Sequence, residues 1–427
     1  MIVPAGQAVM QLPRWRVSLV FFLLLLPALA AGAAPAQLSL PQYRLQAGEL
    51  AVIVNDADAL SVKIGEYYVQ ARGIPPDNLL HVRFEPGKRN MPAREFARVK
   101  ADIEQAAPAL IQAYAITWAS PYRVDCMSFT SALTFGFDRE WCSRRKCATT
   151  RHSPYYGYSG TSPWHDLGIR PSISIAATNF DEARQLIDRG LAADGSLPSG
   201  TAYLVSTSDK ARNVRARIYP HINTVMQDRV KTQIVSTDAL RDRDDVLFYF
   251  TGNAWVEHLD TLTFLPGAIA DHLTSSGGQL TGSGQMSALR WLQAGATGSY
   301  GTVVEPCNLT GKFPNPGILM ESYTGGRTLI EAYWHSVQQP GEGIFIGEPL
   351  AAPFDNVRVE ADDNRLRLYT HSLLPGVYQL MYADDPVGPW RSLGRLRVNL
   401  HEDAFVLPRP GDGYYRLVSA GVQAAPD

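Results

Sequence analysis

Two stretches decide the fold of this chain: GQMSALRWLQAGATGSYGTVVEPC at residues 284–307 and TLIEAYWHSVQQPGEGIFIGEPLAAPF at residues 328–354. The first begins with apolar residues at helical spacing and reaches Gly295, a residue that suits a helix end. Residues 296–304 then combine small and apolar side chains, which predicts a buried strand. The second stretch repeats the pattern, with an amphipathic helix and a short strand at residues 344–346. Helices that alternate with buried strands indicate an α/β sheet.

The chain on the amino-terminal side of these stretches alternates in the same way. Apolar runs at residues 50–54, 79–84 and 113–118 are separated by helical stripes, and a later run, VLFYFT, ends at Thr251. Strands separated by helices favour parallel pairing with right-handed crossovers. We therefore predict an α/β domain over residues 50–354, with a mainly parallel, doubly wound sheet.

The pattern changes after Phe354. Alternating apolar residues, separated by Pro-Gly and Gly-Asp turns at a spacing of about ten residues, predict five or six short strands. We predict a β-rich C-terminal domain and tail at residues 355–427. Residues 34–49 are expected to form a linker ahead of the α/β domain.

The N-terminal residues resemble an export signal. Arg14 and Arg16 precede the apolar run VSLVFFLLLLPALA, and small residues follow it. This order is typical of a secretory signal peptide, which we place at residues 1–33, with cleavage between Ala30 and Ala36. The alternative is an uncleaved membrane anchor. No other stretch approaches membrane-spanning length, so we expect a periplasmic or extracellular protein with no stable membrane span once the leader is removed.

Composition excludes several classes of protein. A hydrophobic content of 45% with 19% charged residues is that of a globular protein rather than a disordered one. The net charge is -2, so no cationic excess is available for phosphate backbones, and we predict no nucleic-acid partner. The sequence contains no G-x-S-x-G, G-x-x-x-x-G-K-[ST], H-E-x-x-H or G-x-G-x-x-G motif. We therefore expect no cofactor.

Residues 120–168 interrupt the alternation of strands and helices and hold three of the four cysteines. Ordinary loops are far shorter, which indicates a functional insertion or one held in place by disulfides. An even number of cysteines in an exported protein favours disulfides. Of the three possible connectivities, we predict the pairs Cys142–Cys147 and Cys126–Cys307. The alternative is a zinc site from Cys142, Cys147 and His152.

Three segments of the chain carry a family resemblance: AGATGSYGTVVEP, GRTLIEAYW and IGEPLAAPF. They resemble a family of exported bacterial proteins, without an assigned activity, that occurs in genomes carrying exosortase, a membrane sorting transpeptidase. The match covers residues 50–354. More remotely, the same block is similar to gingipain and caspase-like peptidases, whose domains end in a comparable segment. The resemblances imply a caspase-like α/β fold and a link to exosortase-type protein sorting or exopolysaccharide export.

The peptidase resemblance also implies where a dyad would lie. Such peptidases carry a histidine base after one central strand and a cysteine nucleophile after the next. By order along the chain, these places fall at Thr251-Gly252 and at Ser275-Ser276, where neither residue type is present. A degenerate site is therefore expected.

Polar residues at the expected strand ends are the remaining candidates for chemistry. A parallel sheet normally opens its cleft at the carboxyl edge, where a nucleophile, a histidine and a carboxylate could act together. The candidate residues are Asp125, His258, His272, Ser276 and Glu305. For each histidine, the alternative is a hydrogen-bonded structural role.

Two functions follow from these patterns. The first is a binding or accessory protein of the cell envelope, with an envelope polypeptide or polysaccharide as its partner. The second is an active hydrolase, directed at peptide or glycan, with a non-standard site at the carboxyl edge of the sheet.

Overall fold

The computed structural model describes Met1, residues 36–145 and residues 147–420. Apart from Met1, the expected signal peptide lies outside these residues. The described residues from Ala36 onward form one compact unit. None of the helices in this described part is long and apolar enough to cross a membrane.

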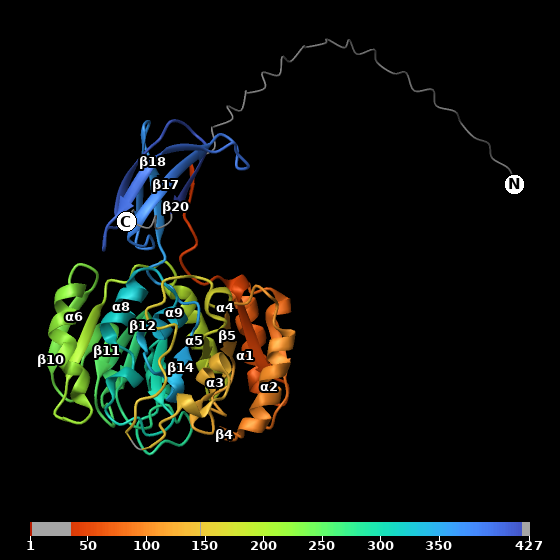
Figure 1. Ribbon diagram of the computed structural model, residues 1–427, viewed down its shortest axis with the longest axis vertical. Coiled ribbons are helices and arrows are strands. Elements are labelled where there is room, and N and C mark those ends of the chain that lie inside the picture. Colours follow the sequence, from red (N-terminus) through yellow and green to blue (C-terminus); the bar gives the residue numbers. More distant parts are fainter. Residues whose placement is uncertain (2–35, 146, 421–427) are drawn as a thin grey trace, which may run out of the picture. The chain divides into compact units, whose positions relative to one another are not determined.

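One sheet of ten strands forms the centre of a mixed α/β arrangement (Figure 1). The strand order is β10-β9-β11-β12-β13-β14-β8-β5-β2-β3. Its pairings are parallel except between β13 and β14, which are antiparallel over five residue pairs. The prediction of a large, mainly parallel sheet is confirmed. The ten strands are β2 (Leu50–Asn55), β3 (Leu79–Val82), β5 (Ala113–Ile116), β8 (Ser172–Ser174), β9 (Thr201–Ser206), β10 (Lys231–Ser236), β11 (Arg243–Thr251), β12 (Leu262–His272), β13 (Gly298–Thr302) and β14 (Gly343–Gly347).

Apolar side chains cover both faces of this sheet. Along β2, Leu50 and Val52 pack into one hydrophobic cluster, whereas Ala51 and Ile53 pack into another. Successive side chains of a strand point to opposite faces, so the two clusters lie on opposite sides of the sheet. The helices of the chain are α1 (Ala59–Arg72), α2 (Ala93–Ala106), α3 (Phe129–Phe135), α4 (Pro163–Leu167), α5 (Phe180–Ala193), α6 (Tyr219–Met226), α7 (Leu289–Ala294), α8 (Pro316–Thr324) and α9 (Leu329–Ser336).

Glycines in β13 and β14 explain why the deciding stretches are rich in small residues. A Cβ added at Gly343 would lie 1.6 Å from the Tyr300 hydroxyl oxygen, and one at Gly298 would lie 2.6 Å from Cδ1 of Leu329. Leu329 begins α9, so the absence of a side chain at Gly298 lets this helix pack directly on the strand.

Glu348 directly follows β14 and is fully buried. Its carboxylate accepts hydrogen bonds from the Tyr68 hydroxyl and from the Arg72 guanidinium, whose Nε lies 3.0 Å away. Arg72 is the last residue of α1, and it also pairs with Asp194, which follows α5. The Gly-Glu-Pro segment therefore ties the end of β14 to the ends of two helices.

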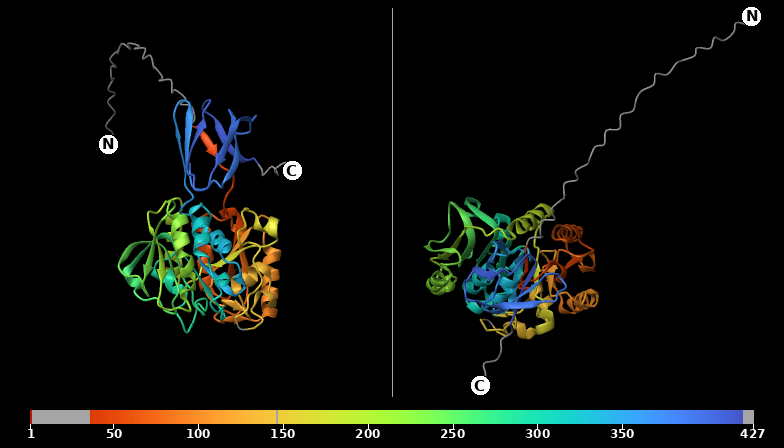
Figure 2. Two further views of the ribbon diagram at one scale, coloured as in Figure 1. Left: turned by 60° about the vertical axis from the view of Figure 1, so that its left-hand side comes forward. Right: turned by 90° about the horizontal axis from the view of Figure 1, so that it is seen from above.

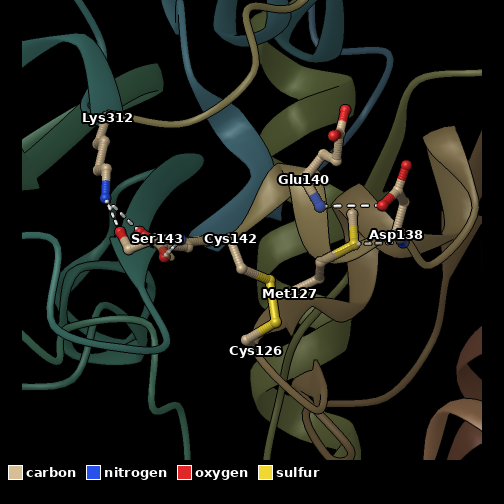
Figure 3. Close-up of a disulfide and its surroundings, with 8 residues drawn as sticks. Cys126, Met127, Asp138, Glu140, Cys142, Ser143 and Lys312 are labelled. Atoms are coloured by element: carbon tan, nitrogen blue, oxygen red, sulfur yellow. Dashed lines mark hydrogen bonds and ion pairs between the residues drawn. A yellow bond between two sulfur atoms is a disulfide. The ribbon is translucent and has the colours of Figure 1, made fainter. Parts of the chain in front are cut away.

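The insertion at residues 120–168 is folded and cross-linked (Figure 3). It contains β6 (Arg123–Val124) and β7 (Met127–Ser128), which join β4 (Asn90–Met91) in a three-stranded sheet, and then α3 and α4. Ser143 follows the short helix Arg139–Trp141, and its Oγ accepts a hydrogen bond from Nζ of the buried Lys312 at 2.6 Å. The ammonium group of Lys312 also pairs with Glu342 at 2.6 Å.

The structure corrects the predicted disulfide pairing. The bonds are Cys126–Cys142 and Cys147–Cys307, not Cys142–Cys147 and Cys126–Cys307. The tight turn between β6 and β7 and the packing of Trp141 on Phe135 bring the first pair together. The second bond joins the insertion to the loop after β13. The alternative zinc site is also wrong, because both of its cysteines are in disulfides.

The C-terminal strands form two small sheets, with orders β15-β16-β19 and β1-β20-β17-β18. Alternate residues of these strands point inward and form one hydrophobic cluster. β1 (Gln37–Ser39) pairs in parallel with β20, and Figure 2 shows it in orange-red among the blue strands. Part of residues 34–49, expected as a linker, is therefore a strand of this sheet. The remaining strands are β15 (Val357–Ala361), β16 (Arg365–Thr370), β17 (Gly376–Ala383), β18 (Arg391–Val398), β19 (Ala404–Pro408) and β20 (Tyr414–Ser419).

Candidate functional site

His272 ends β12 and is buried in a hydrogen-bonded setting. Its Nδ1 accepts a hydrogen bond from the Trp291 indole N–H at 2.9 Å, and its Nε2 donates to the Met286 carbonyl at 3.1 Å. Burial lowers the pKa of His272 to about 4, which keeps the ring neutral at physiological pH. Both ring nitrogens are thus engaged in positioning the loop after β12.

Ser276 lies in that same loop. Its Oγ is 3.1 Å from Oε1 of Gln285 and 3.2 Å from Oγ of Ser283. The Gln285 side chain also accepts hydrogen bonds from the Ser276 backbone N–H and the Thr274 hydroxyl. The immediate neighbours of the Ser276 hydroxyl are therefore an amide and a second hydroxyl, and the amide oxygen is no base.

The other three candidates lie on separate turns. His258 adopts the left-handed conformation before a short helix, with its Nε2 3.5 Å from the carboxylate of Glu257. Asp125 occupies the turn between β6 and β7, also with a positive φ. Glu305 is exposed, and its carboxylate accepts a hydrogen bond from the Cys307 N–H at 2.8 Å. A joint catalytic role for the five residues stays a prediction.

A cavity of about 500 Å³ lies elsewhere, between α6, α8 and the segments before β17 and after β18. We call it the α6–α8 cavity. Its apolar wall comes mainly from α6, the residue before it, α8 and two C-terminal segments. These apolar lining residues are Ile218, Ile222, Val225, Met226, Ile318, Leu373, Leu374 and Leu400. A cavity of this size and lining is typical of sites for small ligands.

Four of the nine histidines of the chain line this cavity, together with polar partners. Ser322 Oγ on α8 lies 2.8 Å from His335 Nδ1 on α9. Burial lowers the pKa of His335 to about 3, and its ring stacks on Tyr155. Among the described residues, His335 Nε2 has no hydrogen-bond partner. The remaining histidines are His221, His371 and His401.

Charged groups of the cavity come from helices and from the C-terminal strands. Arg229, just after α6, donates a hydrogen bond from Nη1 to His371 Nδ1 at 2.9 Å. An arginine cannot accept, so this contact assigns the ring proton of neutral His371 to Nε2. Burial and the charge of Arg229 both lower the pKa of His371. The negative charge of the cavity is that of Glu321, whose carboxylate lies 2.8 Å from His401 Nε2.

Sequence reasoning missed this cavity because it assigned no helix between the two stretches at residues 284–307 and 328–354, where α8 lies. Asn315 followed by Pro316 is a helix-start signal, and in the structure the Asn315 side chain accepts from the Gly317 N–H at 3.0 Å. That signal could have placed Ser322 on a helix. No sequence pattern connects α8 with His371 or His401.

Comparisons with known proteins add little to the site. No protein-family profile and no curated protein match the chain. One solved structure that it resembles is titled "Structure of Protease", with 10% sequence identity and a TM-score of 0.40 over 88% of this chain and 98% of that one. A likeness this distant carries no argument about fold or activity. In the part of the chain that the structure describes, no group of three His, Cys, Asp or Glu residues is placed to hold a metal ion.

Proposed function

We propose that this protein is an exported cell-envelope protein that binds a ligand in the α6–α8 cavity. The observation that carries the proposal is the cavity, with its apolar wall and its converging histidine, arginine and serine side chains. His272, by contrast, uses both ring nitrogens within the fold, which favours a binding role over catalysis at the carboxyl edge. The fold would be a caspase- and gingipain-like sheet without its dyad.

Blocking the cavity tests this proposal. Ile318→Trp places an indole into the cavity from α8, and Ile234→Trp on β10 makes the same change at an exposed position outside it. We expect the anionic aromatic dye 1-anilinonaphthalene-8-sulfonate to bind the wild type and Ile234→Trp alike, and Ile318→Trp much more weakly. Equal dye binding by all three folded proteins, or none by the wild type, would contradict the proposal.

Export and a link to envelope sorting belong to the same proposal. Two disulfides suit an oxidising compartment outside the cytoplasm. The natural ligand would then be part of an envelope polypeptide or polysaccharide handled in exosortase-type sorting or exopolysaccharide export. N-terminal sequencing of the mature protein tests export: we expect a new terminus between Ala30 and Ala36, and an intact Met1 in the membrane fraction would contradict it.

A hydrolase acting on peptide or glycan is the second candidate. The observation that favours it is the Ser322–His335 contact within the cavity. The set Asp125, His258, His272, Ser276 and Glu305 is the other candidate location.

Labelling with a fluorophosphonate probe separates these locations. Labelling that disappears in Ser322→Ala assigns the cavity, and labelling that disappears in Ser276→Ala assigns the carboxyl edge. An unlabelled wild type would contradict both serine candidates.

A further inference from the structure

We infer that the α6–α8 cavity takes an aliphatic carboxylate, with the carboxylate on Arg229 and the alkyl chain along the apolar wall. This inference rests on the proposed binding function and names the chemical class of its ligand. Three observations carry it: a cation that is in no direct ion pair, an apolar surface continuous with it, and a carboxylate nearby that limits the charge of the ligand.

Arg229 is the cation. Its side chain donates to the neutral ring of His371, and no carboxylate lies within ion-pair distance of it among residues 36–145 and 147–420. Glu321 and Asp403 act on its charge from farther away. Its Nε is buried and lacks a hydrogen-bond partner within the same residues. A guanidinium presents several donors in one plane, which match a carboxylate bidentately. An anionic group in the cavity would therefore satisfy both the charge and the free donors of Arg229.

His335 adds a second polar atom without a partner. Its side chain is 6% exposed and lines the same cavity, and its Nε2 makes no hydrogen bond to the described residues. Buried polar atoms rarely stay unpaired in a native protein, so a ligand or an ordered water is expected there.

Exposed apolar residues extend the cavity to the surface. Val225, Leu374 and Leu400 are 40%, 37% and 65% exposed, and all three line it. They continue the buried apolar surface of Ile222 and Met226 on α6. Exposed apolar side chains grouped around an apolar cavity mark a binding site, and an alkyl chain would cover this group.

Glu321 restricts the charge of the headgroup. Its side chain lines the same cavity as Arg229 and has the opposite charge. His401 already contacts the carboxylate of Glu321. Arg327, the other cation of the lining, is paired with the buried Glu331 at 3.0 Å. One cation outside any direct ion pair, with Glu321 and Asp403 nearby, suits a monoanion, whereas the second charge of a phosphate monoester would meet repulsion from these carboxylates.

The experiment compares ligands that differ only in the headgroup. Binding of dodecanoate, dodecyl phosphate, dodecanol and dodecyltrimethylammonium to the full mature chain is measured by calorimetry, below the micelle concentration of each. Arg229→Gln removes the charge but can still donate to His371. Arg217→Gln makes the same change at an exposed position outside the cavity lining. Both variants are checked for an unchanged urea midpoint.

We expect dodecanoate to bind the wild type at least about tenfold more tightly than the other three ligands, since a charge-assisted hydrogen bond to a half-buried cation stabilises a complex by about 1.5 kcal/mol or more. Arg229→Gln should lose this preference and leave dodecanol binding unchanged, and Arg217→Gln should keep it. Dodecanol binding that equals dodecanoate binding in the wild type overturns the carboxylate inference and leaves the binding function in place. The same holds if Arg229→Gln keeps the preference. If none of the four ligands binds the wild type, both the carboxylate inference and the proposed binding function are wrong.

Discussion

Replacing Glu348 by alanine should cost the protein a large part of its stability. The carboxylate is completely buried and receives hydrogen bonds from Tyr68 and Arg72, while the Arg72 side chain is only 6% exposed. Glu348→Ala removes the anion and leaves the guanidinium of Arg72 buried with one remaining partner, Asp194, whose side chain is 38% exposed.

The magnitude follows from these contacts. Breaking a buried ion pair by removing one partner costs about 3–5 kcal/mol, because the other charge stays desolvated. Asp194 compensates part of the Arg72 charge, which favours the lower end, about 3 kcal/mol. The Tyr68 hydroxyl loses its acceptor as well, at a cost of about 1 kcal/mol. We therefore expect the free energy of unfolding to fall by about 3–4 kcal/mol.

Urea unfolding followed by tryptophan fluorescence measures this loss as a lower transition midpoint. The matched control is Glu360→Ala, which breaks the surface pair with Arg358, where both side chains are about half exposed. That change should cost less than about 1 kcal/mol. If Glu348→Ala costs no more than Glu360→Ala, the anchoring role assigned to Glu348 is wrong.

Two further predictions concern the stability contributed by each disulfide and the pH dependence of stability. Loss of the Cys147–Cys307 bond, which spans 160 residues, should lower the free energy of unfolding by about 5 kcal/mol. Loss of the Cys126–Cys142 bond, which spans 16 residues, should lower it by about 3 kcal/mol. Equal urea midpoints for two variants, each with one of these cysteine pairs replaced by serine, would contradict this order. His272 has a pKa lowered to about 4 against an unfolded value near 6.5, so the unfolded chain binds more protons between these values. His272 alone should therefore lower the free energy of unfolding by about 3 kcal/mol from pH 7 to pH 4, and His272→Gln should remove this part of the fall. A pH profile that is the same in both proteins would contradict it.

Much of the central sheet could be predicted from the sequence, because strands buried on both faces are continuous apolar runs. β2 and the second half of β11 are such runs, and helical stripes between them predicted parallel crossovers. The antiparallel direction of β14 could not be predicted, since an apolar run carries no information about direction. The same limit applies to β1. Its three residues show no strand pattern in the sequence, and they form a strand only because they pair with β20.

The disulfide pairing and the cavity were harder to predict from the sequence, for a different reason. Cysteine pairing depends on the turn between β6 and β7 and on the packing of Trp141, neither of which is visible in cysteine spacing. The α6–α8 cavity joins Arg229 to His371 and Glu321 to His401, across 142 and 80 residues. Contacts at such separations follow from tertiary packing, and no local pattern announces them.

The pairing of β1 with β20 has a consequence for the order in which the chain can fold. The hydroxyl of Ser39 donates to the carbonyl of Tyr415, a contact between residues 376 positions apart. During synthesis β1 emerges long before β20, because this long stretch of chain separates them. Closing so long a loop is slow, because its entropic cost precedes any gain from contact. The β1–β20 pairing can therefore form only after β20 has been synthesised, and β1 has no partner strand in this sheet before that point.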